Sequence, residues 1–587
     1  MKIINQGLRV EVLGSLVLAL LVLPLATAES PIADAAMHGD FDSVRILIQE
    51  GEEVNAAQGD GMTALHWAAE NGDIEMLEML ISAGANSEAV TRLGRYTPLH
   101  LASKIGKDAS VVSLLRLGSA VNPRTTTGAV TPLHFAASSG SQVAVKALLD
   151  YGADVDAKEQ QWGQTPLMFA AAFNRTEAIE LLVAHGADIA RAAKVVDIAK
   201  RQQEDRADQV KWNSLRRTLV GSSTGSSEPR QSNSSASTAS NTVPQPVQEV
   251  QLRAVDEIDP LSYADLVGTH GGLTPLLLAV REGHFEAIRT LLDNGADINQ
   301  TSAGDQTSSI LLAAVNGHFD LVEQLLEWGA DPNIASDAGG TPLYAVLNME
   351  WAPKARHPQP VDYMQQQIGY LELMEVLLEF GVDPNVRLKK NLWYTTYARD
   401  LLGVDRSGAT PFWRAAHATD VAAMELLVRY GADPTIATRK TPDRRRRRGE
   451  QEDFSGLSPV PVGGRAVAPI VAAAGVGYGQ GFAGNSHRHV PDGWIPAVQY
   501  LVEEHGADVN DRDHNGYSPV HHAAARGDNE LILYLVSLGA DVTLVSRTGQ
   551  TTVDLANGPV QRIQPFPETI ALLESLGAIN NHNCVTC

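Results

Sequence analysis

The sequence has few of the residues that build redox centres, zinc sites or positively charged binding surfaces. Cys584 and Cys587 are the only cysteines, so a zinc site with a second cysteine pair is excluded. Aromatic residues make up 5% of the chain. The chain contains 46 basic and 69 acidic residues, which gives a formal net charge of −23. This acidity argues against nucleic acid or an anionic membrane as the main partner.

Long apolar runs are also missing after the N-terminus. Val12 to Leu25 is apolar, but it is shorter than the ~20 residues that a membrane span needs. Lys2 and Arg9 precede this run, and the small residues Ala26-Thr27-Ala28 follow it. We therefore expect residues 1–28 to be a secretory signal peptide and the mature chain to be periplasmic or secreted. An uncleaved anchor helix is the alternative.

What the sequence does have is a repeated unit of about 33 residues, clearest from Thr131 onward. Thr131 is suited to cap a helix, Pro132 fits the first helical position, and Gly152 can end the second helix in a left-handed conformation. The unit therefore predicts two helices and a hairpin turn. Copies start at residues 30, 63, 97, 131 and 165, which are 33 or 34 residues apart.

A second series of copies follows a change in composition after residue 190. Its members start at residues 274, 308, 341, 410, 468, 518 and 551. Because the later spacings exceed one period, the extra residues are assigned to insertions at 351–370, 387–407, 438–465, 475–493 and 559–567.

The unit resembles the ankyrin repeat, and the chain as a whole resembles exported bacterial ankyrin-repeat proteins with long C-terminal insertions. The resemblance implies an all-α solenoid of about 12 helix-turn-helix and β-hairpin units in two blocks, repeats 1–5 at 29–190 and repeats 6–12 at 263–580. It also implies protein binding on the concave face made by hairpins and first helices. No catalytic residue and no cofactor is expected.

Two segments separate these blocks. Residues 191–220 are highly charged, and the run from Lys200 to Leu219 contains neither glycine nor proline. We expect one partly exposed helix that caps the first block, since a solenoid needs a polar end. Residues 221–262 are rich in Ser and Pro and predict a disordered linker.

The motif residues of the repeat are assigned to the scaffold. A histidine at the fourth position is implied by the resemblance to bind the motif threonine and nearby backbone. His522 stands where other copies carry apolar residues. The scaffold set is Thr63, His66, Thr97, His100, Thr131, His134, Thr165, Thr274, Thr341, Thr410, Ser518 and His521.

The departures from the repeat are where we expect a specific function. Trp, Tyr and Arg are the residues that most often anchor interfaces, and they gather around the insertion after residue 387. We therefore predict a non-catalytic adaptor that binds a protein through repeats 8–10. The alternative is that these side chains pack the insertion onto the repeats. The candidates are Tyr344, Trp393, Tyr394, Tyr397, Trp413 and Arg414.

The tail 581–587 carries a different hypothesis, a thiol-redox or metal-linked function. Cys584 and Cys587 can close a disulfide, and His582 would add a third, weak metal ligand. The alternating glycines of Gly475–Gly481 suggest a phosphate loop, but they follow a helix rather than a strand, which favours a flexible loop. The basic run Arg444–Arg448 predicts a disordered loop, with docking to an acidic partner as the alternative.

Overall fold

The computed structural model describes residues 30–221, 261–352, 361–392, 404–442, 452–478, 488–558 and 564–584. It divides into two compact units. Unit 1 comprises residues 1–161 with 184–186, and unit 2 comprises residues 162–183 with 187–587. No described helix is both long and apolar enough to cross a membrane.

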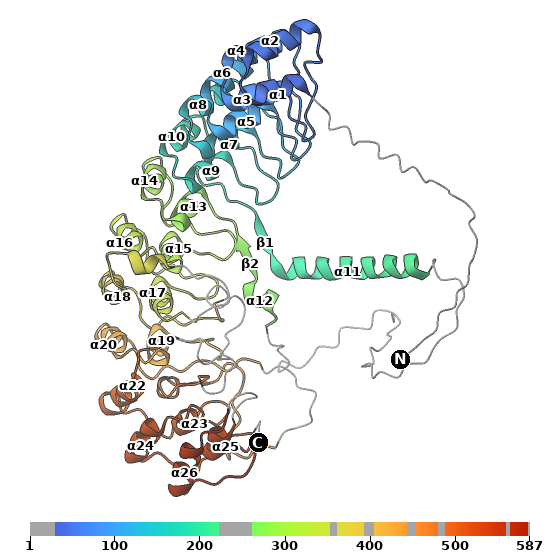
Figure 1. Cartoon of the computed structure of the whole chain (residues 1–587). Helices are drawn as coiled ribbons and strands as arrows, with labels where there is room; N and C mark the ends of the chain where they lie inside the picture. The colour runs from blue at the N-terminus through green and yellow to red at the C-terminus, as the bar shows by residue number, and fades with distance from the viewer. Residues whose placement is uncertain are drawn as a thin grey trace, which may run out of the picture. The chain divides into compact units, whose positions relative to one another are not determined.

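Unit 1 is built from successive helix pairs joined by hairpin loops. The first helices of the pairs pack side by side, as do the second helices, and the loops project from the side of the first helices (Figure 1). Small residues such as Ala68, Ala102 and Ala136 are fully buried between neighbouring helices, which allows this close stacking. The pairs are α1 (Pro31–Met37) with α2 (Phe41–Glu50), α3 (Ala64–Asn71) with α4 (Ile74–Ser82), α5 (Pro98–Ile105) with α6 (Asp108–Arg116), and α7 (Pro132–Ser139) with α8 (Gln142–Asp150).

The ends of these helices follow from the repeat motif. Pro98 and Pro132 are the first residues of α5 and α7, where no backbone N–H is needed. Gly106 and Gly140 follow the last residues of the same helices with φ of 72° and 81°. A side chain is disfavoured in this left-handed region, so glycine fixes where each first helix stops.

Unit 2 continues the same alternation of first and second helices. Its first helices also pack on one another in succession. The elements are α9 (Pro166–Ala172), α10 (Thr176–Ala184), β1 (Val195–Asp197), α11 (Ile198–Gly221), α12 (Tyr263–Val267), β2 (Thr269–Gly271), α13 (Pro275–Glu282), α14 (Phe285–Asp293), α15 (Ser309–Asn316), α16 (Phe319–Glu327), α17 (Pro342–Glu350), the 3-10 helix η1 (Asp362–Gln365), α18 (Tyr370–Glu379), α19 (Pro411–His417), α20 (Val421–Arg429), α21 (Pro469–Ala473), α22 (Trp494–Gln499), the π-helix η4 (Tyr500–Glu504), α23 (Pro519–Ala524), α24 (Asn529–Ser537), α25 (Thr552–Asn557) and α26 (Pro567–Ser575).

The charged helix α11 does not cap the fifth repeat, so that prediction is wrong. Helix α13 packs directly on α9, and His284 Nε2 lies 3.1 Å from the carbonyl oxygen of Ala172. Asn174 Oδ1 accepts the N–H of Ala287 at 3.0 Å across the same junction. The apolar end of the fifth repeat is therefore already covered. α11 is left exposed because its sequence offers no apolar face to bury.

A two-stranded sheet marks where the chain leaves the helix stack and returns to it. β1 pairs antiparallel with β2, with Val196 opposite His270. α11 and α12 lie between these strands in the sequence and contact each other (Figure 1). Repeat six thus follows repeat five in space, and most of the predicted linker, residues 222–260, lies outside the described residues.

Candidate functional site

The motif histidines form identical hydrogen-bonded clamps at the start of first helices. The backbone N–H of Thr97 donates to His100 Nδ1 at 3.1 Å, and His100 Nε2 lies 3.2 Å from the carbonyl oxygen of Val130 in the next hairpin. His66 repeats this geometry with Thr63 N at 3.2 Å and Tyr96 O at 3.0 Å. Because a backbone N–H can only donate, Nδ1 accepts and Nε2 carries the proton.

These clamps hold neutral imidazoles inside the protein. Burial lowers the pKa of both His66 and His100 to about 4. His134 and His521 accept the backbone N–H of Thr131 and Ser518 in the same way, at 3.3 and 3.2 Å. In repeats without the histidine, the motif hydroxyl accepts the N–H three residues later, as Thr165, Thr274, Thr341 and Thr410 do. All of these contacts serve the fold.

Trp413 occupies the histidine position of its repeat and makes the equivalent contact. Its indole Nε1 donates to the carbonyl oxygen of Val467 at 3.0 Å, just ahead of the next first helix. The ring is fully buried and stacks on His417, with 5.1 Å between the ring centroids. The prediction that Trp413 anchors a partner is therefore wrong, because no partner can reach it.

Arg414 and Tyr344 are also interior residues, only 1% and 2% exposed. Arg414 donates from Nε to Asn348 Oδ1 at 2.9 Å and from Nη2 to the carbonyl oxygen of Trp351 at 2.6 Å. Arg414 joins consecutive repeats and neither side chain presents a surface, so the prediction is wrong for both. The remaining candidates of that set, Trp393, Tyr394 and Tyr397, lie outside the described residues.

Accessible apolar side chains gather instead on the first helices of unit 1. Trp67, Leu101 and Phe135 each follow a motif histidine, lie 34 residues apart, and are partly exposed on α3, α5 and α7. The Tyr96 ring lies 5.9 Å from that of Phe135 and carries Lys104 Nζ 5.7 Å from its centroid. We call Trp67, Tyr96, Leu101 and Phe135 the inner strip.

The geometry of the inner strip is fixed by polar contacts at its edge. Trp67 Nε1 donates to Gln58 Oε1 at 2.8 Å, and Gln58 Nε2 donates to Asp34 Oδ1 at 2.6 Å. Reasoning from the sequence missed this strip because it looked for departures from the repeat. The 34-residue recurrence of large apolar residues at the fifth motif position was the signal that could have found it.

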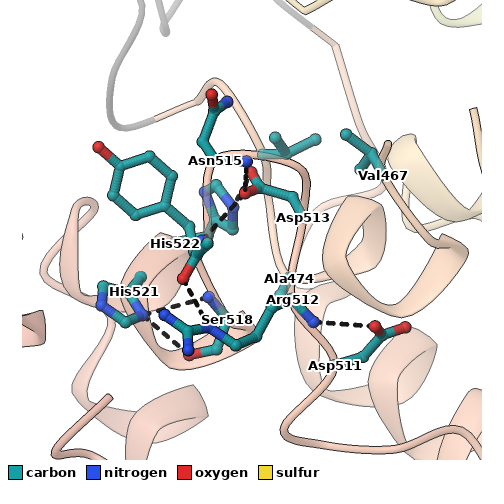
Figure 2. A network of polar contacts seen from close by, with 12 residues as sticks. Val467, Ala474, Asp511, Arg512, Asp513, Asn515, Ser518, His521 and His522 are labelled. Atoms are coloured by element: carbon teal, nitrogen blue, oxygen red, sulfur yellow. Dashed lines mark hydrogen bonds and ion pairs between the residues drawn. The ribbon is translucent and has the colours of Figure 1, made fainter. Parts of the chain in front are cut away.

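Repeat eleven, which starts at Ser518, replaces two ordinary scaffold residues by an ionisable pair. Figure 2 shows Asp513 and His522 directed toward one another, with Asp513 Oδ2 3.6 Å from His522 Nε2 and both side chains buried. Asp513 Oδ1 also accepts the N–H groups of Asn515 and Tyr517 at 2.8 and 2.9 Å. Burial opposes the charge on Asp513, but His522, the nearby His514 and the N–H of Tyr517 together lower the pKa of the carboxyl.

This pair closes a hairpin rather than forming a catalytic site. In other hairpins a hydroxyl at the position of Asp513 accepts the same turn N–H, as Thr125 does from Val130 at 3.0 Å and Ser546 from Gln550 at 3.0 Å. Figure 2 also places Ser518 and His521 of the motif clamp beside the pair. No nucleophile lies in that clamp apart from the capping hydroxyl of Ser518, which binds His521 Nδ1 at 2.9 Å.

The tail is tied to the last repeat. Asn583 N donates to Asp554 Oδ1 at 3.0 Å, and its side-chain amide donates to the carbonyl oxygen of Thr548 at 2.8 Å. Cys584 is disulfide-bonded, while Cys587 lies outside the described residues. The part of the chain that the structure describes holds no group of three potential metal ligands, His582 included. The basic run Arg444–Arg448 lies outside the described residues as well.

Comparison with known families agrees with the repeat geometry. A family model described as ankyrin repeats (3 copies) matches residues 32–125, 99–193 and 254–336. A second model, ankyrin repeats (many copies), matches residues 486–536, and together the matches cover about half of the chain. The chain is an ankyrin-repeat protein.

Relatives of this ankyrin-repeat protein match it over short segments. It is 39% identical over 85 residues to ankyrin repeat and SAM domain-containing protein 6 of Rattus norvegicus, which is 14% of this chain and 9% of the relative. It is 38% identical over 69 residues to protein phosphatase 1 regulatory subunit 27 of Mus musculus, 12% of this chain and 44% of the relative. With ankyrin repeat domain-containing protein 39 of Homo sapiens it shares 38% identity over 63 residues, 11% and 34% of the two chains. The chain spans less than half the length of each of these relatives.

Proposed function

We propose that this protein is a non-catalytic scaffold that binds a protein partner along the inner strip of unit 1. The observation that carries the proposal is the partial exposure of Trp67, Leu101 and Phe135 at one position of three consecutive first helices. Membership of the ankyrin-repeat family supports a role in protein interaction. Neither the motif histidines nor the Asp513–His522 pair offers an accessible reactive group.

Physical reasoning favours this surface over the rest of unit 1. A folded protein gains by covering adjoining apolar side chains, and aromatic residues provide most of the energy at interfaces. The indole of Trp67 and the ring of Tyr96 are held by Gln58 and by Phe135, so little side-chain freedom is lost on binding. The partner expected here presents an apolar segment that crosses several repeats.

The wider setting of the scaffold is part of the proposal. Export is supported by the signal-like sequence of residues 1–28, which lie outside the described residues. We also propose that the helix pairs form a solenoid of about 12 repeats. Trp393, Tyr394 and Tyr397 stay as a proposed second contact in the insertion 387–407, before repeat nine. Nothing in the described tail supports the thiol-redox or metal-linked alternative.

Site-specific photo-crosslinking in the native cell tests the interface. A benzophenone amino acid at Leu101 or Phe135 is expected to capture the same partner, identified by mass spectrometry. The matched control carries the probe at Val143, an exposed residue of the second helix α8. Adducts at Val143 as abundant as those at Leu101, or no adduct at the strip, would contradict the proposed surface. Deleting residues 1–28 and fractionating the cells tests export separately.

A further inference from the structure

One insertion of unit 2 behaves like a bound peptide rather than like part of the repeat. Residues 452–464 form neither helix nor strand and are mostly exposed. They nevertheless contact the hairpins that precede α23 and α25, between residues 512 and 549. A segment with so little buried surface needs directed polar contacts to hold it in place.

Arg547 provides most of these contacts. Its guanidinium forms an ion pair with Asp453 and donates to the carbonyl oxygens of Leu457 at 3.2 Å and Ser458 at 2.7 Å. The backbone carbonyl of Arg547 accepts the N–H of Phe454 at 3.1 Å. Its Nε also donates to the carbonyl oxygen of His514 at 2.8 Å, which anchors the side chain to the neighbouring hairpin.

Two further residues complete the surface beneath the segment. Arg512 Nη1 donates to the carbonyl oxygen of Ser455 at 3.4 Å, while its Nε holds the carbonyl oxygen of Gly516 at 2.8 Å. The ring of Phe454 lies against Gly549, where a Cβ atom would come within 3.1 Å of Phe454 Cδ2. The aromatic ring therefore packs closely on Gly549, and a side chain at that position would require the ring to shift by a few tenths of an ångström.

The chemistry of these contacts does not depend on the segment being part of the same chain. Apart from one carboxylate and one ring, the contacts are to main-chain atoms, which every extended peptide presents. Asp453 also accepts the N–H of Ser455 at 2.9 Å, so the peptide brings its own turn. Attachment to the chain raises the effective concentration of the segment to about the millimolar range, so a weak contact is enough to fill the site.

We infer that the hairpin surface of Arg512, Arg547 and Gly549 is a docking site for an extended peptide with an acidic residue followed directly by an aromatic one. Residues 452–458 occupy this site in cis, and a partner peptide of that chemistry binds by displacing them. This site lies in unit 2 and goes beyond the interface proposed for the inner strip of unit 1. Failure of either proposal leaves the other standing.

Peptide binding in trans tests this inference. The probe is a fluorescein-labelled synthetic peptide with the sequence of residues 451–462, measured by fluorescence anisotropy against two full-length proteins. One is the wild type, and the other has residues 452–462 replaced by a Gly/Ser chain of equal length. We expect the replaced protein to bind the peptide at least 10-fold more tightly than the wild type. No binding to the replaced protein, or equal binding to both, overturns the inference.

Substitutions in the replaced protein assign the binding to this surface. Arg547→Ala is expected to weaken peptide binding by at least 10-fold, and an Asp453→Asn change in the peptide should weaken it as well. Arg439→Ala is the matched control, since Arg439 also lies eight residues after a helix-ending glycine and makes no hydrogen bond to residues 452–458 among those described. Circular dichroism and urea unfolding of each variant show whether it is folded. An equal loss in a folded Arg439→Ala protein would contradict the assignment.

Discussion

The fifth position of the repeat motif is partly exposed in three repeats of unit 1 but varies in unit 2, where Phe169 and Leu312 are partly exposed and other residues at this position are buried. In unit 1 it holds Trp67, Leu101 and Phe135, which are partly exposed. In unit 2 the same position holds Arg414 and His522, which are almost completely buried. One helix position is therefore a surface in the regular repeats of unit 1 and an interior at Arg414 and His522 of unit 2.

Arg414, whose repeat lies between two insertions, shows that a motif position can serve packing between repeats instead of forming a surface. Arg414 reaches Asn348 and the carbonyl oxygen of Trp351, both outside its own repeat. His522 is paired with a carboxylate of its own hairpin. The regular repeats of unit 1 contact their neighbours through the motif clamps and leave the residues of the inner strip partly exposed. The irregular repeats use that face for their own cohesion.

The largest expected effect comes from truncating a buried tryptophan of unit 2, Trp413 at the fourth motif position, in comparison with a partly exposed one of unit 1, Trp67 at the fifth. Trp413→Ala removes a fully buried ring and its hydrogen bond to Val467, and should cost about 3–5 kcal/mol of unfolding free energy. Trp67→Ala removes a partly exposed ring and should cost about 1 kcal/mol. Hydrogen exchange read by mass spectrometry localises each loss to the repeats concerned. Equal losses would show that the two positions do not differ as described.

Restoring ordinary residues to repeat eleven tests whether its buried pair is only a substitute for them. Asp513→Thr or His522→Leu alone should cost about 2–3 kcal/mol, because each leaves a buried polar partner without its counterpart. The double variant should recover most of that loss, since a hydroxyl can accept the turn N–H as Thr125 does. Urea unfolding of all four proteins gives the coupling energy. Additive losses would mean that the pair has no mutual dependence.

Much of the fold could be predicted because the residues that start and end each helix act locally. Thr131 and Pro132 mark the start of α7, and Gly140 marks its end, as the sequence suggested. Such signals act over one turn of helix and need no knowledge of the rest of the chain. The resemblance to ankyrin repeats assigned His66 and His100 to the scaffold, and in the structure both accept the backbone N–H of the motif threonine.

The candidate site was less predictable because it depends on contacts across insertions. Trp413 looked like an interface anchor, yet its indole replaces the motif histidine by reaching Val467, 54 residues away. α11 was misplaced for a related reason, since its sequence does not reveal that α13 already covers the fifth repeat.

Acid should destabilise the protein through the buried histidine clamps of unit 1. In the unfolded chain His66 and His100 bind a proton near pH 6.5, but in the folded protein only near pH 4. Protons therefore favour unfolding between these values, and stability is complete above pH 6.5 and falls as pH drops toward 4. Each histidine should contribute a loss of about 2 kcal/mol at pH 5. Urea midpoints measured from pH 7 to 4.5 check this.

One substitution tests whether His100 causes this acid sensitivity. His100→Asn is expected to be less stable at pH 7, because it loses the bond to Val130, but its stability should fall less steeply with acid than that of the wild type. An unchanged slope would mean that His100 does not cause the acid sensitivity.

The smallest expected effect comes from a feature that the two units share. Arg116 pairs with Glu78 between second helices of unit 1, and Arg429 Nη1 pairs with Glu375 Oε1 at 3.1 Å between second helices of unit 2. All four side chains are well exposed, so solvent and salt screen both pairs. Glu78→Gln and Glu375→Gln should therefore each cost about 0.5 kcal/mol, and less in high salt. Urea unfolding at low and high salt measures both. Similar small values would confine the contrast between the units to their inner helix faces, whereas a large loss in one unit alone would extend it to their outer faces.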